Sequence, residues 1–198
     1  MISDEIKKRL TFVIELDRLK SVVRQSPLAD RSRKENSAEH SWHLAMFALA
    51  FAEQDSAVDV CRAVRMLLIH DIVEIDAGDT PIHGSSAGLA AQQEAELGAA
   101  QRIFGLLPHL QGKELFELWL EFEKGETPTA AFAKALDRFQ PLLLNTLTGG
   151  GTWTESNVSE AQVIERYMPV IQRGSAALHE IAIGLVQDYF RKVPSLEG

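Results

Sequence analysis

The sequence is nearly free of cysteine. Cys61 is the single cysteine among 198 residues, so no disulfide can form within the chain. Proteins without disulfides are typical of reducing compartments, and we expect a cytoplasmic protein. Because no general base is in view beside Cys61 in the segment 60–64, we expect a small core residue rather than a nucleophile.

Long apolar runs are also missing. The longest uncharged apolar stretch, residues 44–52, is far shorter than the roughly 20 residues that cross a bilayer as a helix. Residues 1–5 contain neither a basic segment nor an apolar one, so we expect no secretory leader. These absences argue against a membrane partner.

Basic residues are in the minority. The chain has 20 Lys and Arg against 28 Asp and Glu, which gives a net charge of -8. Affinity for long nucleic acid comes mainly from phosphate neutralisation by Lys and Arg, so long DNA or RNA is not an expected partner. A small anionic substrate stays compatible, because a local cation can outweigh the overall charge.

Strand signals are scarce, since runs of alternating β-branched residues are missing and helix formers dominate. With no repeat and no linker, the chain predicts an all-α fold in a single domain over residues 1–198. Residues 24–35 are expected to form a polar, basic link. The expected helices cover residues 3–23, 36–52, 58–77, 89–104, 113–124, 128–148 and 157–191, the last with interruptions near 169 and 174.

Local signals set several helix ends. Asn36 and Glu39 stand in the spacing of a capping box, and so do Asn157 and Glu160. Residues 127–128, Thr-Pro, predict an N-cap followed by a proline in the first turn. The helix 36–52 is apolar nearly all round from residue 42, so we expect it at the centre of a bundle.

Pro141 lies inside the expected helix 128–148. A proline has no amide hydrogen, and its ring clashes with the preceding turn. We therefore expect a kink or a break there.

The adjacent pair His70-Asp71 interrupts an apolar run at residues 66–73. Burying an imidazole and a carboxylate is costly unless each finds a partner, and one divalent cation would partner both. Glu74 lies on the same side of the expected helix, one turn further on, close enough to hold a metal-bound water. Asp79 falls just past the helix end, at the mouth of the pocket that this face lines.

His40 and Asp137 lie on two other expected buried helices. Each residue has another interpretation. A lone buried histidine usually bonds a backbone carbonyl, Asp137 alone reads as a surface or capping carboxylate, and Asp71 alone could pair with Arg62 or Arg65. Taken together, imidazole and carboxylate side chains suit a divalent transition metal with open positions.

The order His40, His70-Asp71, Asp137 resembles the HD superfamily of metal-dependent phosphohydrolases, whose pattern is H…HD…D. A closer resemblance, to the YfbR-like 5'-deoxynucleotidase branch, rests on the segments 35–41 and 70–79. Glu74 and Gly78-Asp79 stand where that branch has a glutamate and a Gly-Asp pair. The likeness covers roughly residues 8–147.

The resemblance implies an HD-domain helical bundle that hydrolyses 5'-(deoxy)nucleoside monophosphates to nucleoside and phosphate by metal-activated water. It implies one divalent metal ion, which could be Mn, Co, Mg, Fe, Ni or Zn. Glu74 and Asp79 would be the catalytic carboxylates, with base and acid unassigned. The implied metal ligands are His40, His70, Asp71 and Asp137.

The resemblance also implies an arginine that holds the substrate phosphate. Arg24 is the first candidate and Arg33 the second. Gln25 follows Arg24 where relatives have an aromatic residue next to the sugar or base, so the chain departs from the pattern on the nucleoside side. Relatives are often homodimers, and the apolar segment 176–190 is a candidate subunit contact.

Two other functions compete with hydrolysis. A non-catalytic nucleotide-binding or regulatory HD module predicts a damaged motif, whereas every ligand and both carboxylates are present. An HD-type di-iron oxygenase needs additional histidines for a second metal. The chain has six histidines, and no further pair stands at a suitable spacing.

Overall fold

The fold is seen in a computed structural model, which describes residues 2–51, 57–80 and 86–192. Most of these residues are helical and the strands are limited to one short hairpin, which confirms the expected all-α class. Ten α-helical segments lie within the described ranges: α1 (Asp4–Leu16), α2 (Ser37–Phe51), α3 (Val60–Ile69), α4 (Glu74–Ala77), α5 (Ser86–Phe104), α6 (His109–Lys124), α7 (Pro128–Leu147), α8 (Thr152–Glu155), α9 (Glu160–Gly174) and α10 (Ala176–Lys192).

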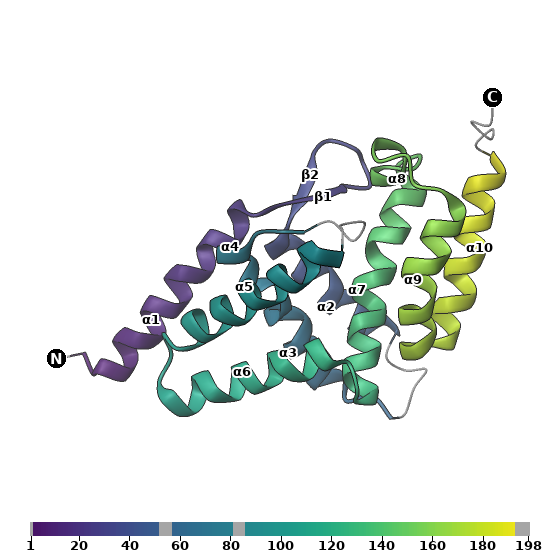
Figure 1. The fold of residues 1–198 in the computed structure, drawn as a ribbon. Helices are drawn as coiled ribbons and strands as arrows, with labels where there is room; N and C mark the ends of the chain where they lie inside the picture. The colour runs from purple at the N-terminus through teal and green to yellow at the C-terminus, as the bar shows by residue number, and fades with distance from the viewer. Residues whose placement is uncertain (1, 52–56, 81–85, 193–198) are drawn as a thin grey trace.

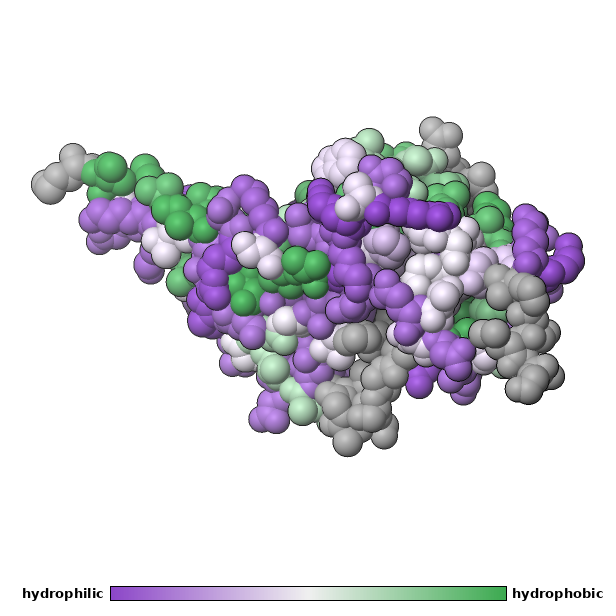
Figure 2. All heavy atoms as spheres, turned by 90° about the horizontal axis from the view of Figure 1, so that it is seen from above, coloured by the Kyte–Doolittle hydropathy of each residue, from purple (hydrophilic) through white to green (hydrophobic). Residues whose placement is uncertain are grey.

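The long helix α7 runs through the middle of the molecule (Figure 1). The helices α9 and α10 pack together on one side of it, and α2, α3, α5 and α6 lie on the other. Helix α1 projects from the body and carries exposed apolar side chains along its length (Figure 2). Among the described residues, none of the helices combines the length and the apolar character needed to cross a bilayer.

The expected helix 3–23 and the expected link 24–35 are both wrong in detail. Helix α1 ends at Leu16, a 3-10 turn η1 (Asp17–Ser21) follows, and Val22 is extended with φ -82° and ψ 107°. The chain then forms an antiparallel hairpin of β1 (Val23–Pro27) and β2 (Lys34–Asn36). The hairpin tip uses Arg31 at φ 62°, which lets the chain reverse. Arg24 therefore lies on a strand and not at a helix end.

The expected helix 58–77 is not continuous. Helix α3 begins at Val60, where the Asp59 side chain accepts a hydrogen bond from the Arg62 amide. It gives way at His70 to a 3-10 turn, η3 (His70–Val73), which is followed by α4. In a 3-10 turn residues three apart eclipse each other, so Asp71 and Glu74 still share one side.

Helix α2 has the expected capping box. The Asn36 side chain accepts from the Glu39 amide at 3.0 Å, and the Glu39 carboxylate accepts from the Asn36 amide at 2.8 Å. The expected burial on all sides is wrong, because Trp42 is 61% exposed and Met46 and Leu49 are exposed one and two turns further along. Only the opposite face of α2 packs against α3 and α7.

Helix α7 starts as expected, with the Thr127 hydroxyl accepting from the Ala130 amide. It continues through Pro141 without a break. The proline cannot bond the carbonyl of Asp137, four residues earlier, but buried leucines on both sides of it hold the helix in the core.

The C-terminal helices differ from the expectation at one cap. The capping box of α9 is formed by Ser159 and Gln162, while Asn157 lies before it in a left-handed conformation at φ 51°. Of the two expected interruptions, the one near Pro169 is wrong, because α9 runs through this proline, and the one near Gly174 is confirmed, because α9 ends there.

Two smaller expectations are also wrong. Helix α6 begins at His109 and not near residue 113, because Pro108 supplies an extended N-cap. Cys61 is exposed and not a core residue, since it lies in the first turn of α3 on the solvent side.

Gly174 allows α9 to approach α7 closely. A Cβ atom at this position would fall 2.2 Å from the Ala131 carbonyl oxygen and 2.6 Å from the Ala135 Cβ. Because that contact overpacks a buried interface, we expect Gly174→Ala to lower the free energy of unfolding by about 1–3 kcal/mol, measured by urea unfolding. Gly184→Ala is the matched control, since the Cβ that this substitution adds would have no neighbouring atom within 4 Å outside its own helix backbone. Equal urea midpoints for the two variants would contradict the close approach.

Candidate metal centre

Three helical segments bring two imidazoles and a carboxylate together. His40 comes from α2, His70 from η3 and Asp137 from α7, and their ligand atoms all lie within 4.8 Å of one another. Asp137 Oδ1 lies 3.2 Å from His40 Nε2 and 3.6 Å from His70 Nε2. This donor set is one that divalent transition metals accept.

Asp71 adjoins this cluster. Its Oδ1 lies 3.0 Å from His70 Nε2, and its Oδ2 lies 3.8 Å from His40 Nε2. The structure thus brings together all four residues that the sequence indicated as ligands. The alternative pairing of Asp71 is not seen, because Arg62 pairs with Glu121 and Arg65 with Glu114.

The His70 ring is held in one orientation. Its Nδ1 donates to the Leu67 carbonyl at 2.9 Å, and the Trp119 indole donates to the His70 carbonyl at 3.2 Å. Its Nε2 therefore faces the cluster, buried and without a hydrogen-bond partner among the described residues. A buried ring nitrogen of this kind fits a metal ligand, because an unpartnered polar atom is otherwise costly.

Glu35 lies beside the ring of the other histidine, and the sequence alone did not single it out. The residue is 2% exposed, and its Oε1 lies 3.3 Å from His40 Nδ1. Its Oε2 accepts from the Gln140 side chain at 2.9 Å. Glu35 lies in the segment 35–41 that carries the resemblance, but a charged residue in a polar stretch reads as exposed until the hairpin folds over α2.

The titratable groups of the cluster shift one another. Burial lowers the pKa of His40 and of His70, but the carboxylates around the two rings raise it more, so both pKa values lie above the usual range. Burial raises the pKa of Asp137, yet the two imidazoles beside its carboxylate hold it well below its usual value. A bound cation would take the place of the ring protons.

Arg24 lies between the cluster and the two expected catalytic carboxylates, with its side chain 12% exposed. Its Nη1 is 2.6 Å from Asp71 Oδ2, 3.4 Å from Glu74 Oε1 and 3.6 Å from Asp79 Oδ1. Burial lowers the pKa of Arg24, but these carboxylates outweigh it and raise the pKa above its usual value. The guanidinium is therefore a fixed cation beside Asp71.

Glu74 and Asp79 reach the site from one short turn. Gly78 ends α4 at φ 75°, a conformation that suits glycine, and turns the chain back so that Asp79 faces Arg24. Burial and the charge of Asp71 raise the pKa of Glu74 to about 9, and burial also raises the pKa of Asp79. The Glu74 carboxyl can therefore carry a proton near neutral pH.

Arg33 does not reach the site. Its guanidinium lies on the outside of the hairpin and forms an exposed ion pair with Glu39, with Nη2 2.9 Å from Oε2. The turn before β2 sends this side chain to solvent, whereas Arg24 points inward. Of the two arginines considered for phosphate, the structure places only Arg24 beside the cluster.

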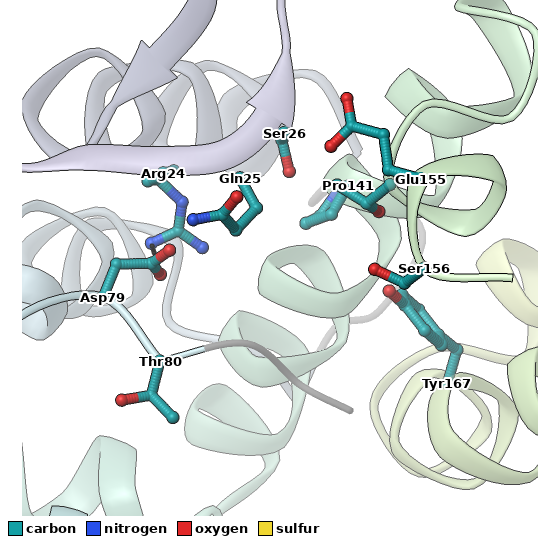
Figure 3. Close-up of a pocket in the computed structure, with 10 residues that line it drawn as sticks. Arg24, Gln25, Ser26, Asp79, Thr80, Pro141, Glu155, Ser156 and Tyr167 are labelled. Carbon is teal, nitrogen blue, oxygen red and sulfur yellow. Dashed lines mark ion pairs between the residues drawn. The ribbon is translucent and has the colours of Figure 1, made fainter. Parts of the chain in front are cut away.

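Two hollows meet near Thr80, which lines both. One, of about 440 Å³, is lined in part by His70, Asp71 and Asp137. The other, of about 150 Å³, begins at Arg24 and Asp79 and extends toward α8 and α9 (Figure 3). A small molecule can thus approach both the cluster and the arginine.

A family model described as "HD domain" matches residues 16–179. The chain belongs to the HD domain family. The helical bundle described above is therefore that of an HD domain, as the sequence predicted.

Curated relatives of this HD domain protein carry one activity in their names. The 5'-deoxynucleotidase HDDC2 of Homo sapiens is 33% identical over 112 residues, 56% of this chain and 53% of that protein. The 5'-deoxynucleotidase hdd1 of Schizosaccharomyces pombe is 29% identical over 129 residues, 63% of this chain and 64% of that protein. The chain thus spans about half to two thirds of the length of these relatives.

A solved structure is similar over nearly the whole chain. The crystal structure of a predicted metal-dependent phosphohydrolase from Magnetospirillum magnetotacticum MS-1 has a TM-score of 0.89 and is 49% identical. The match covers 96% of this chain and 97% of that one. The similarity therefore includes the hairpin and the C-terminal helices.

We expect Glu35→Gln to weaken metal binding about 10- to 100-fold, because the neutral amide holds the His40 ring less firmly and lowers its basicity. Metal titration by calorimetry measures the change, and circular dichroism checks that the fold is kept. Glu39→Gln is the matched control, since glutamine also completes a capping box at an exposed position. Equal metal affinities in the two variants would remove Glu35 from this role.

Proposed function

We propose that this HD domain protein is a metal-dependent phosphohydrolase that converts 5'-(deoxy)nucleoside monophosphates to nucleoside and phosphate. One observation carries the proposal: Asp71 lies within 3.0 Å of a cluster imidazole and 2.6 Å from the buried Arg24. A metal-binding cluster and a phosphate-binding cation thus adjoin through one side chain. The names of the relatives and of the similar solved structure support the same activity.

The residues that would hold the metal are His40, His70, Asp71 and Asp137. Within the described part of the chain, His40, His70 and Asp137 make one group that could hold a metal, with Asp71 beside it. One such group supports a single divalent ion, drawn from Mn, Co, Mg, Fe, Ni and Zn. When bound, such an ion polarises a phosphoryl oxygen and acidifies a water molecule.

Arg24 would bind the phosphate. Its guanidinium can exchange the ion pairs to Asp71 and Asp79 for charge-assisted hydrogen bonds to phosphate oxygens. The arginine lies in the hairpin next to Glu35 and is buried, so it enters the reaction already oriented.

Glu74 and Asp79 would orient the attacking water and move protons. The Ser37 hydroxyl donates to Glu74 Oε2 and fixes that carboxyl. The other carboxyl oxygen of Glu74, Oε1, faces Arg24. Because both carboxyls have raised pKa values, one can hold the proton that the leaving 5' oxygen takes up while the other accepts a proton from water.

Phosphate release over a panel of deoxynucleoside and ribonucleoside monophosphates, with several divalent metals, tests the proposal. We expect metal-dependent release by the unmodified protein. Glu74→Gln should keep its metal and lose about 10²- to 10⁴-fold in kcat, the usual contribution of general acid–base catalysis. Asp71→Asn should lose metal binding instead.

Two results would count against this scheme. An active Glu74→Gln enzyme would remove Glu74 from proton transfer. Silence of the unmodified protein across the whole panel would favour the non-catalytic nucleotide-binding module.

The two arginines provide a matched pair of variants. We expect Arg24→Lys to lower kcat/KM about 10- to 100-fold, because an ammonium keeps the charge but cannot form the paired hydrogen bonds of a guanidinium. Arg33→Lys should leave kcat/KM unchanged, since Arg33 pairs with Glu39 at the surface. Steady-state kinetics on the best substrate distinguish the two, and the reverse order would reassign the phosphate site.

A further inference from the structure

A cavity of about 150 Å³ begins at Arg24 and extends away from the metal cluster. Figure 3 shows Arg24 and Asp79 at one side of it and Glu155, Ser156 and Tyr167 at the opposite side. A substrate whose phosphate lies at Arg24 can therefore extend its remaining substituent into this cavity.

The cavity is partly open to solvent, and its size limits how much of a ligand it can surround. A cavity of roughly 150 Å³ in a protein core accommodates one benzene molecule. A pyrimidine base is a single six-membered ring of similar size, whereas a purine has two fused rings. Pro141 and Tyr167 line the cavity, and Tyr167 is buried against Trp153 with ring centroids 6.3 Å apart, so this wall is rigid.

Lys34 connects two polar side chains that line the cavity, Gln25 and Glu155. Lys34 Nζ donates to Gln25 Oε1 at 2.9 Å and lies 3.2 Å from Glu155 Oε2. It thus connects the hairpin with α8 at the rim of the cavity. Among the described residues, no hydrogen bond engages the Gln25 side-chain amide nitrogen or the second Glu155 oxygen, so the first is available to donate to a ligand and the second to accept.

These donor and acceptor positions match the edge of a base. Pyrimidines present carbonyl oxygens as acceptors and N–H or amino groups as donors, and a carboxylate is a suitable acceptor for the cytosine amino group. Gln25 directly follows Arg24 in the chain and lines the cavity together with Asp79, so it lies between the phosphate and base regions.

We propose that this cavity binds the nucleobase of the substrate and prefers single-ring bases, with Gln25 and Glu155 as the residues that determine specificity. Gln25 donates to a base carbonyl, Glu155 accepts from a base N–H, and Lys34 positions both side chains. The inference rests on the proposed function, because it takes the substrate phosphate to lie at Arg24.

Hydrolysis kinetics with three substrates test the inference: deoxycytidine monophosphate, deoxyadenosine monophosphate and 2-deoxyribose 5-phosphate, which has no base. We expect kcat/KM to be at least tenfold higher for the pyrimidine nucleotide than for the purine nucleotide. Glu155→Ala widens the cavity and removes the acceptor. It should lower that ratio at least fivefold, and it should affect deoxycytidine monophosphate more than 2-deoxyribose 5-phosphate.

Glu165→Ala is the matched control, because Glu165 is an exposed glutamate on α9 that does not line the cavity. It should leave the ratio of the two nucleotides unchanged. Calorimetric binding of the same two nucleotides to the metal-loaded protein gives a readout that does not require turnover. The unmodified protein should bind the pyrimidine nucleotide at least tenfold more tightly, and Glu155→Ala should reduce this difference.

Equal kcat/KM values for the two nucleotides in the unmodified protein would overturn the inference while leaving the phosphohydrolase proposal standing. A Glu155→Ala variant that loses the same factor on all three substrates would also overturn it. If no substrate is hydrolysed but binding is still selective for the pyrimidine and sensitive to Glu155, the proposed function fails and the base site stands.

Discussion

The site depends on the two-sided carboxylate of Asp71. One oxygen faces an imidazole of the cluster, and the other forms the 2.6 Å ion pair with Arg24. A buried carboxylate next to other carboxylates is unfavourable unless cations compensate it, so Arg24 and the cluster must form together. The change from α3 to the 3-10 turn at His70 places both His70 and Asp71 at the cluster.

The short hairpin supplies what the helices cannot. Arg24 on β1 and Glu35 on β2 approach the cluster from the same side, with Arg24 Nε 3.7 Å from Glu35 Oε1. Glu35 then orients His40, while Arg24 balances Asp71. An otherwise helical bundle thus uses two adjacent strands to deliver one cation and one orienting anion.

The sequence predicts the all-α class and the convergence of His40, His70, Asp71 and Asp137, because charged or polar residues inside apolar runs need partners wherever the chain folds. It does not predict the hairpin, since the segment 23–36 contains few β-formers and is stabilised by packing on α2. Because the hairpin is not predicted, the burial of Glu35 is not predicted either, and Arg33 remains a candidate for phosphate binding beside Arg24. The capping box expected at Asn157 shifted two residues because Ser159 and Gln162 satisfy the same hydrogen bonds.

Helix α7 carries Asp137 of the cluster and Pro141 of the cavity wall, and it passes through the proline unbroken. The two residues are one turn apart, about 6 Å along the helix axis. The backbone of α7 therefore fixes the distance between the position for the reacting end of a substrate and the position for its far end. A ligand with a longer spacer between phosphate and ring could not place both groups at these two positions at once, whatever side chains surround it.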